Sequence, residues 1–145
     1  MSQWYGNTRT NYFRVNNEEK YKELFKHLVS DSGDNIADFS KNQNDEVLHA
    51  FGTYGSIDFL EKIPQENNED LEYNFDCFIS ELQKILPDNE AFIMIESGNE
   101  KLRTVTGYAL VVTRDKIQNI ELRDWAVSTA KQLLNNPNFE TQVEY

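Results

Sequence analysis

The sequence predicts an α+β fold: a mainly antiparallel sheet of about five or six strands with three helices. Apolar residues recur at helical spacing in three separate segments, and short branched or aromatic runs stand between these segments. Most of the connections between the runs are too short for a helical crossover, which favours antiparallel pairing. A chain of 145 residues fits a single domain, 1–145, with one core.

The N-terminal part predicts a strand followed by a helix. Residues 11–15 (NYFRV) place Phe13 and Val15 on one side, as a half-buried strand does. Residues 16–29 then place apolar side chains on one helical face, with Asn16 as a cap three residues before a glutamate. We expect this helix to end before residue 31.

A hairpin and a loop are expected next. Residues 36–40 and 47–51 are short apolar segments around the polar run 41–44, a pattern typical of a hairpin. Residues 64–70 form the most polar stretch of the chain and predict an exposed loop.

The segment 75–86 predicts the second helix, with Asn74 as its cap and Pro87 as its stop. Residues 91–95 are apolar on both faces, as in a central strand, and 97–99 (SGN) are expected to turn the chain toward a long strand over 102–113. These two strands should pair antiparallel.

The last elements predicted are an edge strand over 117–122 and a helix around Trp125 to Leu134, stopped by Asn135, Asn136 and Pro137. Beyond the helix, residues 136–145 are expected to form a loose tail.

The charge of the chain is strongly localised. Residues 31–100 contain seventeen Asp and Glu and three Lys, a balance of −14, whereas residues 1–30 balance at +2 and residues 101–145 at +1. Net acidity of this size repels nucleic acid and anionic membranes and favours a basic protein surface as partner.

The composition points to a cytoplasmic protein. A single cysteine, Cys77, allows no intramolecular disulfide, the first residues lack the pattern of a secretory signal, and no apolar run approaches the ~20 residues that span a bilayer.

No sequence pattern predicts catalysis, a metal or a cofactor. His27 and His49 have no Asp, Glu or Cys at a zinc-like spacing, and Cys77 stands beside Asp76, which would raise the pKa of its thiol. We therefore expect a protein that is not an enzyme, with no cofactor and structural roles for these three side chains.

The acidic block allows two interpretations. In one, its residues are solvated positions that keep the protein soluble. In the other, they form a DNA-mimicking face that occupies the DNA-binding channel of a basic protein. The expected binding residues are then Asp45, Glu46, Glu66, Glu69, Asp70 and Glu72.

A second functional hypothesis is an accessory interaction module of unknown partner. An exposed aromatic patch, formed by Trp4 and Tyr5 with Tyr12 and Tyr54, would bind that partner, since aromatic side chains often anchor interfaces. Such binding should resist salt, whereas a DNA mimic should be sensitive to it. A homodimer is also possible in general terms, because symmetric dimers are common, but no particular residue of the sequence indicates one.

Two segments carry a family resemblance: residues 4–15 fit WYGxxRxNYFRV and residues 96–109 fit ExGNEKLRxVTGYA, with a weaker link at 75–86. These segments resemble a family of small uncharacterised proteins carried on bacterial plasmids, conjugative elements and phages. The resemblance implies a genetic setting and no catalytic or ligand residues. Mobile elements often encode small acidic proteins that block restriction or CRISPR nucleases, so it favours an anti-defence role.

Overall fold

A computed structural model describes residues 4–61 and 72–141, in which it contains three helices and eleven strands. The side chains of Trp4 and Glu61 lie outside the described part. Every strand pair is antiparallel, so the predicted α+β class with a mainly antiparallel sheet is confirmed.

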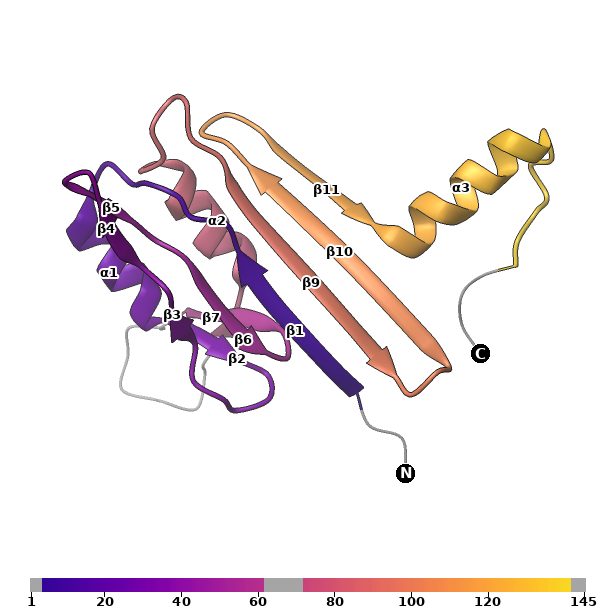
Figure 1. Cartoon of the computed structure of the whole chain (residues 1–145), viewed down its shortest axis with the longest axis horizontal. Helices are drawn as coiled ribbons and strands as arrows, with labels where there is room; N and C mark the ends of the chain where they lie inside the picture. The colour runs from indigo at the N-terminus through magenta and orange to yellow at the C-terminus, as the bar shows by residue number, and fades with distance from the viewer. Residues whose placement is uncertain (1–3, 62–71, 142–145) are drawn as a thin grey trace.

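The main sheet has six strands in the order β11-β10-β9-β1-β6-β3. β1 is first in the chain but lies inside the sheet, between β9 and β6 (Figure 1). The bounds are β1 Trp4–Thr10, β3 Ala37–Asp38, β6 Phe51–Tyr54, β9 Phe92–Glu100, β10 Thr104–Val112 and β11 Ile117–Glu121.

Two small sheets and three helices complete the fold. A three-stranded sheet contains β2 Leu28–Ser30, β7 Ile57–Glu61 and β8 Glu72–Tyr73, and a separate hairpin contains β4 Lys41–Gln43 and β5 Glu46–Leu48. The helices are α1 Glu18–Lys26, α2 Phe75–Gln83 and α3 Leu122–Leu134. In Figure 1, α3 extends from the end of β11 away from the rest of the molecule.

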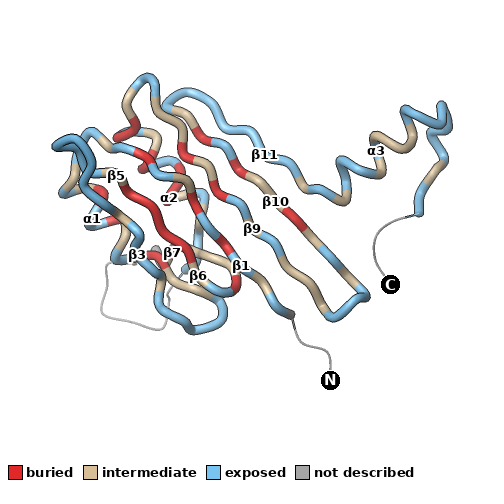
Figure 2. The backbone as a smooth tube through the Cα atoms, viewed as in Figure 1, coloured by how far each residue is buried: buried red, intermediate tan, exposed pale blue. Residues whose placement is uncertain are grey.

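The core lies between one face of the main sheet and the helices α1 and α2. Four phenylalanines are fully buried there, and their rings meet mostly edge to face: Phe13 and Phe92 at 5.1 Å between ring centroids, Phe51 and Phe78 at 6.1 Å. Pairs of this kind contribute about 0.5–1.5 kcal/mol beyond the burial of their area. Figure 2 shows the buried residues in this part of the molecule and none in α3.

The first strand begins earlier than expected. β1 spans Trp4–Thr10, and within the predicted strand 11–15 the structure has an isolated bridge, from Phe13 to His49. The buried side chains of β1 are Thr8 and Thr10, whose hydroxyls donate to Gly55 O and Asn11 O. Because β1 buries threonines in place of large apolar residues, its sequence shows no hydrophobic alternation. The prediction therefore placed the first strand too late in the chain.

The first helix is shorter than predicted and its cap is shifted by one residue. Asn17, not Asn16, accepts a hydrogen bond from Lys20 N at 3.0 Å, and α1 ends at Lys26. Residues 28–30 leave the helix and form β2, since they pair with β7. Their spacing continues the helical pattern, so the sequence alone could not reveal the break.

The predicted hairpin is present, but most of its expected turn is strand, because residues 41–43 form β4 and pair with β5. The turn lies at Asn44 and Asp45, which both have positive φ (53° and 65°), a backbone that Asn and Asp tolerate well. The turn predicted at 97–99 is wrong, because these residues continue β9 and the chain reverses at 101–103 instead.

The later elements lie where the sequence predicts them, but α2 ends at Gln83, three residues before the predicted end, and β10 spans Thr104–Val112 within the predicted 102–113. Asn74 caps α2 by accepting from Cys77 N, β9 pairs with β10, and β11 is an edge strand. α3 begins at Leu122, three residues earlier than expected, and ends at Leu134, with Asn135 as its left-handed C-cap. Residues 136–141 form neither helix nor strand, and the rest of the predicted tail lies outside the described residues. Among the described helices, none is long and apolar enough to cross a membrane.

Candidate partner-binding site

A hollow of about 680 Å³ lies where β1 and β6 meet the loop that follows β2. It is lined by two tyrosines and two aspartates, with small and polar residues between them. The full lining is Tyr5, Gly6, Asn7, Asp31, Ser32, Asp34, Tyr54 and Gly55. Both tyrosines are well exposed, Tyr5 to 61% and Tyr54 to 73%.

Gly55 allows the loop to approach the strands. Its φ is +89°, and its N–H donates to Gly6 O at 2.6 Å. A Cβ at this position would collide with Asp31 Oδ1 and press on Ser32. Glycine is therefore required here both for the backbone conformation and for the space that Asp31 occupies.

The carboxylate of Asp31 is held in place by the backbone. Ser56 N donates to Asp31 Oδ1 at 2.8 Å, and Asp31 N donates to Ser56 O at 3.0 Å. Asp34 is held by the same loop, since Ser32 Oγ lies 3.0 Å from Asp34 Oδ2 and can donate to it. The start of the loop is fixed to β6 because Oγ of Ser30, the last residue of β2, donates to Tyr54 O at 2.9 Å.

These two carboxylates have no cationic partner within the described residues. The ion pairs of residues 4–61 and 72–141 involve other acids. Two fixed negative charges beside two exposed aromatic rings suit a cation, which the ring faces attract and the carboxylates bind by charge-assisted hydrogen bonds. The chemistry of the hollow thus fits an arginine or lysine side chain.

No protein-family model, curated protein or solved structure matches the chain. The site therefore has to be interpreted from its own geometry.

The predicted acidic face is spread over different elements. Asp45 lies in the β4–β5 turn and Glu46 begins β5, whereas Glu72 lies on β8 in another sheet. Glu66, Glu69 and Asp70 lie outside the described residues. Of the placed acids, Asp45 and Glu72 are exposed, while Glu46 already binds a cation of this chain.

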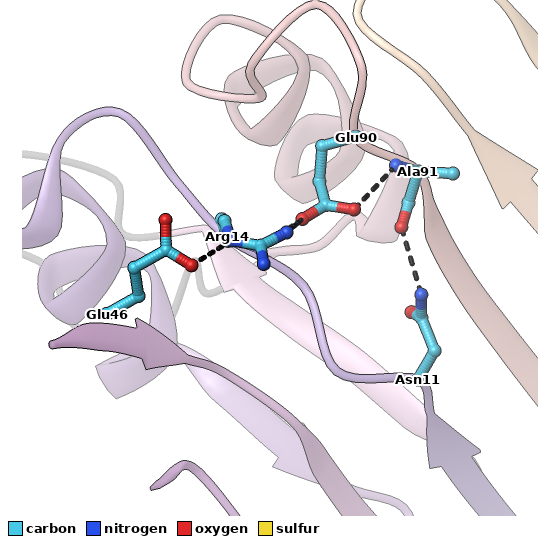
Figure 3. Close-up of polar contacts among 5 residues, drawn as sticks. All are labelled: Asn11, Arg14, Glu46, Glu90 and Ala91. Atoms are coloured by element: carbon cyan, nitrogen blue, oxygen red, sulfur yellow. Dashed lines mark hydrogen bonds and ion pairs between the residues drawn. The ribbon is translucent and has the colours of Figure 1, made fainter. Parts of the chain in front are cut away.

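Arg14 forms an ion pair with the Glu46 carboxylate. Its Nε lies 2.8 Å from Glu46 Oε2, and its guanidinium and backbone N–H also reach Glu90 Oε2, at 3.4 and 2.8 Å (Figure 3). The pKa of Arg14 is raised by the hydrogen bond and the charge of Glu46, with a smaller contribution from Glu90. Glu46 therefore ties the hairpin to the body of the protein and is a poor candidate for partner binding.

Only some of the aromatic side chains proposed for partner binding lie at the hollow. Tyr5 and Tyr54 line the hollow, whereas Tyr12 is covered by cations of its own chain, Lys41 Nζ at 4.3 Å from the ring centroid and Arg9 at 5.7 Å. Trp4 opens β1, and its side chain lies outside the described part.

The histidines have structural surroundings. His49 is 5% exposed, with Nε2 2.8 Å from Glu18 Oε1 and Nδ1 3.2 Å from Ser40 Oγ, so both ring nitrogens are engaged. His27 Nδ1 lies 2.9 Å from Leu60 O. In the described part of the chain, no three His, Cys, Asp or Glu side chains are grouped as metal ligands.

The sequence did not single out Asp31 and Asp34 from the other acids. The signal that could have found them is the run Asp31-Ser32-Gly33-Asp34, a turn sequence that holds two carboxylates close together. What the sequence could not show is that this turn lies beside Tyr5 and Tyr54.

Proposed function

We propose that the protein is a non-enzymatic inhibitor of the anti-defence type, which binds a basic surface of a nuclease or other DNA-binding protein. The observation that carries this proposal is the hollow in which Asp31 and Asp34, without cationic partners in the described chain, lie beside Tyr5 and Tyr54. The acidic segment to which both aspartates belong, −14 over residues 31–100, supplies the long-range attraction to a basic surface.

The two hypotheses from the sequence, acidic mimicry and an aromatic patch, meet at this site. Carboxylates would take the place of DNA phosphates at the arginines and lysines of the partner. The tyrosines would stack on the same cationic side chains and supply apolar contact area. The genetic setting of a mobile element, and with it the anti-restriction or anti-CRISPR class, rests on the sequence resemblance.

Salt separates the two contributions. A contact dominated by carboxylates weakens as ionic strength rises, because the Debye length falls from about 10 Å at 0.1 M toward about 3 Å at 1 M. A contact dominated by stacking tyrosines changes little. An accessory module that binds through Tyr5 and Tyr54 is therefore the second candidate function.

The test is retention of partners by the tagged full-length protein from a bacterial lysate at low salt and at about 0.5 M salt. We expect a nuclease or DNA-binding protein that is retained at low salt and lost at high salt, and whose binding to DNA the purified protein inhibits. A partner with no basic nucleic-acid-binding surface would contradict the proposal, and one that survives high salt would favour the aromatic module.

A further inference from the structure

The main sheet carries an apolar patch on the face opposite the core. Along β9 and β10 the side chains of Phe92, Met94, Leu110 and Val112 are buried, so the alternating residues between them point to the other face. There the register places Val111 opposite Ile93, and Ala109 opposite both Ile95 and Ile120. We call these residues the outer patch: Ile93, Ile95, Ala109, Val111 and Ile120.

The outer patch is open to solvent. Ile95 is 51% exposed, Val111 38% and Ile120 36%. The patch spans three neighbouring strands, β9, β10 and β11, whereas a half-solvated antiparallel sheet ordinarily carries polar side chains on its open face. Contiguous apolar surface of this kind marks an interaction site in soluble proteins.

The helix α3 presents a second open apolar surface. None of its 13 residues is buried. Residues at helical spacing along it form one apolar stripe: Leu122, Trp125, Ala126, Ala130 and Leu133. Trp125 is 54% exposed and Leu133 83%. A helix of this length is marginal in water without tertiary packing, so the stripe needs a cover.

The stripe begins on the same side of the sheet as the outer patch. Leu122 lies over Gly107, whose missing Cβ would collide with the leucine side chain, and Gly107 is on the outer face. Beyond Leu122, however, α3 leads away from the sheet (Figure 1). The helix therefore leaves the outer patch of its own chain uncovered.

Charge favours a second copy of the chain as the occupant. The whole stripe and three of the five residues of the outer patch lie in residues 101–145, which balance at only +1. The charge of −14 lies in residues 31–100, which supply Ile93 and Ile95 on β9. Contact through these apolar, mainly C-terminal surfaces brings fewer like charges together than contact between two acidic parts.

The dimensions also suit such a contact. A helix of 13 residues is about 20 Å long and can cross about four strands spaced about 4.8 Å apart, so it covers a three-stranded patch. A symmetric exchange forms the helix–patch contact twice. Each contact then needs to bury only about 500 Å² for the dimer to reach the ~1,000 Å² expected of a biological interface.

We propose that two copies of this chain form a symmetric dimer in which α3 of each copy packs across the outer patch of the other. The dimer does not depend on the proposed anti-defence function, because the hollow is lined by other residues.

The first experiment measures the mass of the full-length protein by light scattering from about 1 µM to about 100 µM, a range that brackets dissociation constants of weak to moderate dimers. The wild type is expected at twice the monomer mass of 17.0 kDa at the upper end. Val111→Lys in the patch and Leu133→Lys in the stripe should each shift it to the monomer mass. The matched control is Leu102→Lys, which lies in the β9–β10 turn at 96% exposure and should leave the dimer intact.

The second experiment mixes the two disabled variants. A Leu133→Lys copy keeps a sound patch and a Val111→Lys copy keeps a sound helix, so a mixed dimer retains one intact contact of two. Dimer recovery in the mixture, absent from either variant alone, would support the exchange. A wild type that stays monomeric throughout, a dimer that survives both substitutions, or a mixture without recovery would overturn it.

Discussion

Asn11 and Ile93 are joined by two hydrogen bonds that continue the pairing of β1 and β9 beyond Thr10. The Asn11 N–H donates to Ile93 O at 3.0 Å, and the Ile93 N–H donates to Asn11 Oδ1 at 2.8 Å. Asn11 Nδ2 also donates to Ala91 O at 3.0 Å (Figure 3). The side-chain amide of Asn11 thus forms the hydrogen bonds that the backbone of a paired strand would form, at the point where the chain leaves β1.

Replacing Asn11 with alanine should destabilise the protein by about 1–3 kcal/mol, because the partly buried N–H of Ile93 in β9 and the C=O of Ala91 just before β9 lose their partners. Urea unfolding measures this change in the free energy of unfolding. Asn119→Ala, at an exposed position of edge strand β11, serves as control and should stay within about 0.5 kcal/mol of the wild type. Equal effects of the two substitutions would refute a special role for Asn11.

Substitutions at Gly55 and Gly33 test whether the close approach of the loop at Gly55 stabilises the hollow. Both have positive φ, +89° and +83°, so alanine costs about 1–2 kcal/mol of backbone strain at either position. At Gly33 a Cβ meets nothing within 4 Å, whereas at Gly55 it collides with Asp31. Gly55→Ala should therefore lose more stability than Gly33→Ala in thermal unfolding, and it should also weaken partner binding.

Tyr21 carries a buried hydroxyl with no hydrogen-bond partner among the described residues. Tyr21→Phe is therefore expected to leave stability unchanged or to raise it by up to about 1 kcal/mol, since an unpaired buried polar group is costly. Tyr54→Phe is the exposed control and should have no effect. A loss of more than about 1 kcal/mol in Tyr21→Phe would show that the hydroxyl has a stabilising partner.

The buried Tyr21 hydroxyl should also make the stability of the protein depend on pH in alkaline solution. Burial, with smaller contributions from Asp38 and Glu18, raises its pKa above the ordinary value for tyrosine. The folded protein then resists losing this proton more than the unfolded chain does. The contribution of Tyr21 to the free energy of unfolding should be constant below about pH 10 and fall above it. Tyr21→Phe should lessen that fall in denaturant titrations at several pH values.

The Glu81 carboxyl should make the stability of the protein depend on pH in acidic solution. Hydrogen bonds from Lys84 and from Lys20 on α1 lower the pKa of its carboxyl. The stabilisation is present above the ordinary glutamate pKa of about 4.3 and is lost as pH falls through the lowered value. A carboxyl titration by NMR should show this lowered pKa, and high salt should reduce the shift because the three side chains are partly exposed. An unshifted Glu81 would contradict the ion pairs that join α1 to α2.

Elements with strong local signals could be predicted from the sequence. Asn74 is an ideal cap before an apolar face of helical period, and α2 begins there as expected. β9 begins with the apolar run 92–95, β10 is long and rich in branched residues, and the two strands pair antiparallel as predicted. By contrast, β1 buries Thr8 and Thr10, whose hydroxyls form hydrogen bonds, so its position depends on tertiary contacts that no local pattern carries.

The sequence indicated the kinds of side chain that line the hollow but not its position. Acids were expected to bind a basic partner, whereas an aromatic patch that includes Tyr5 and Tyr54 was a separate hypothesis with an unknown partner. The sequence favoured Glu46, which the structure pairs with Arg14, because nothing local distinguishes a paired carboxylate from one without a partner. Asp31 meets Tyr5 only through the approach of the β2–β3 loop to β1 and β6, a contact set by Gly55 and Ser56.

We expect the hollow, and not acidity in general, to bind the partner. The most direct test compares two variants that each lose two negative charges. Asp31→Asn with Asp34→Asn removes charge inside the hollow while keeping oxygen acceptors for Ser56 N and Ser32 Oγ. Asp45→Asn with Glu72→Gln removes the same charge at exposed positions outside it.

The measurement is the affinity of each variant for the captured partner at low salt. We predict a loss of at least about tenfold for the hollow variant, which is about 1.4 kcal/mol, and less than about threefold for the control. Equal losses in the two variants, or no loss in the hollow variant, would contradict the account.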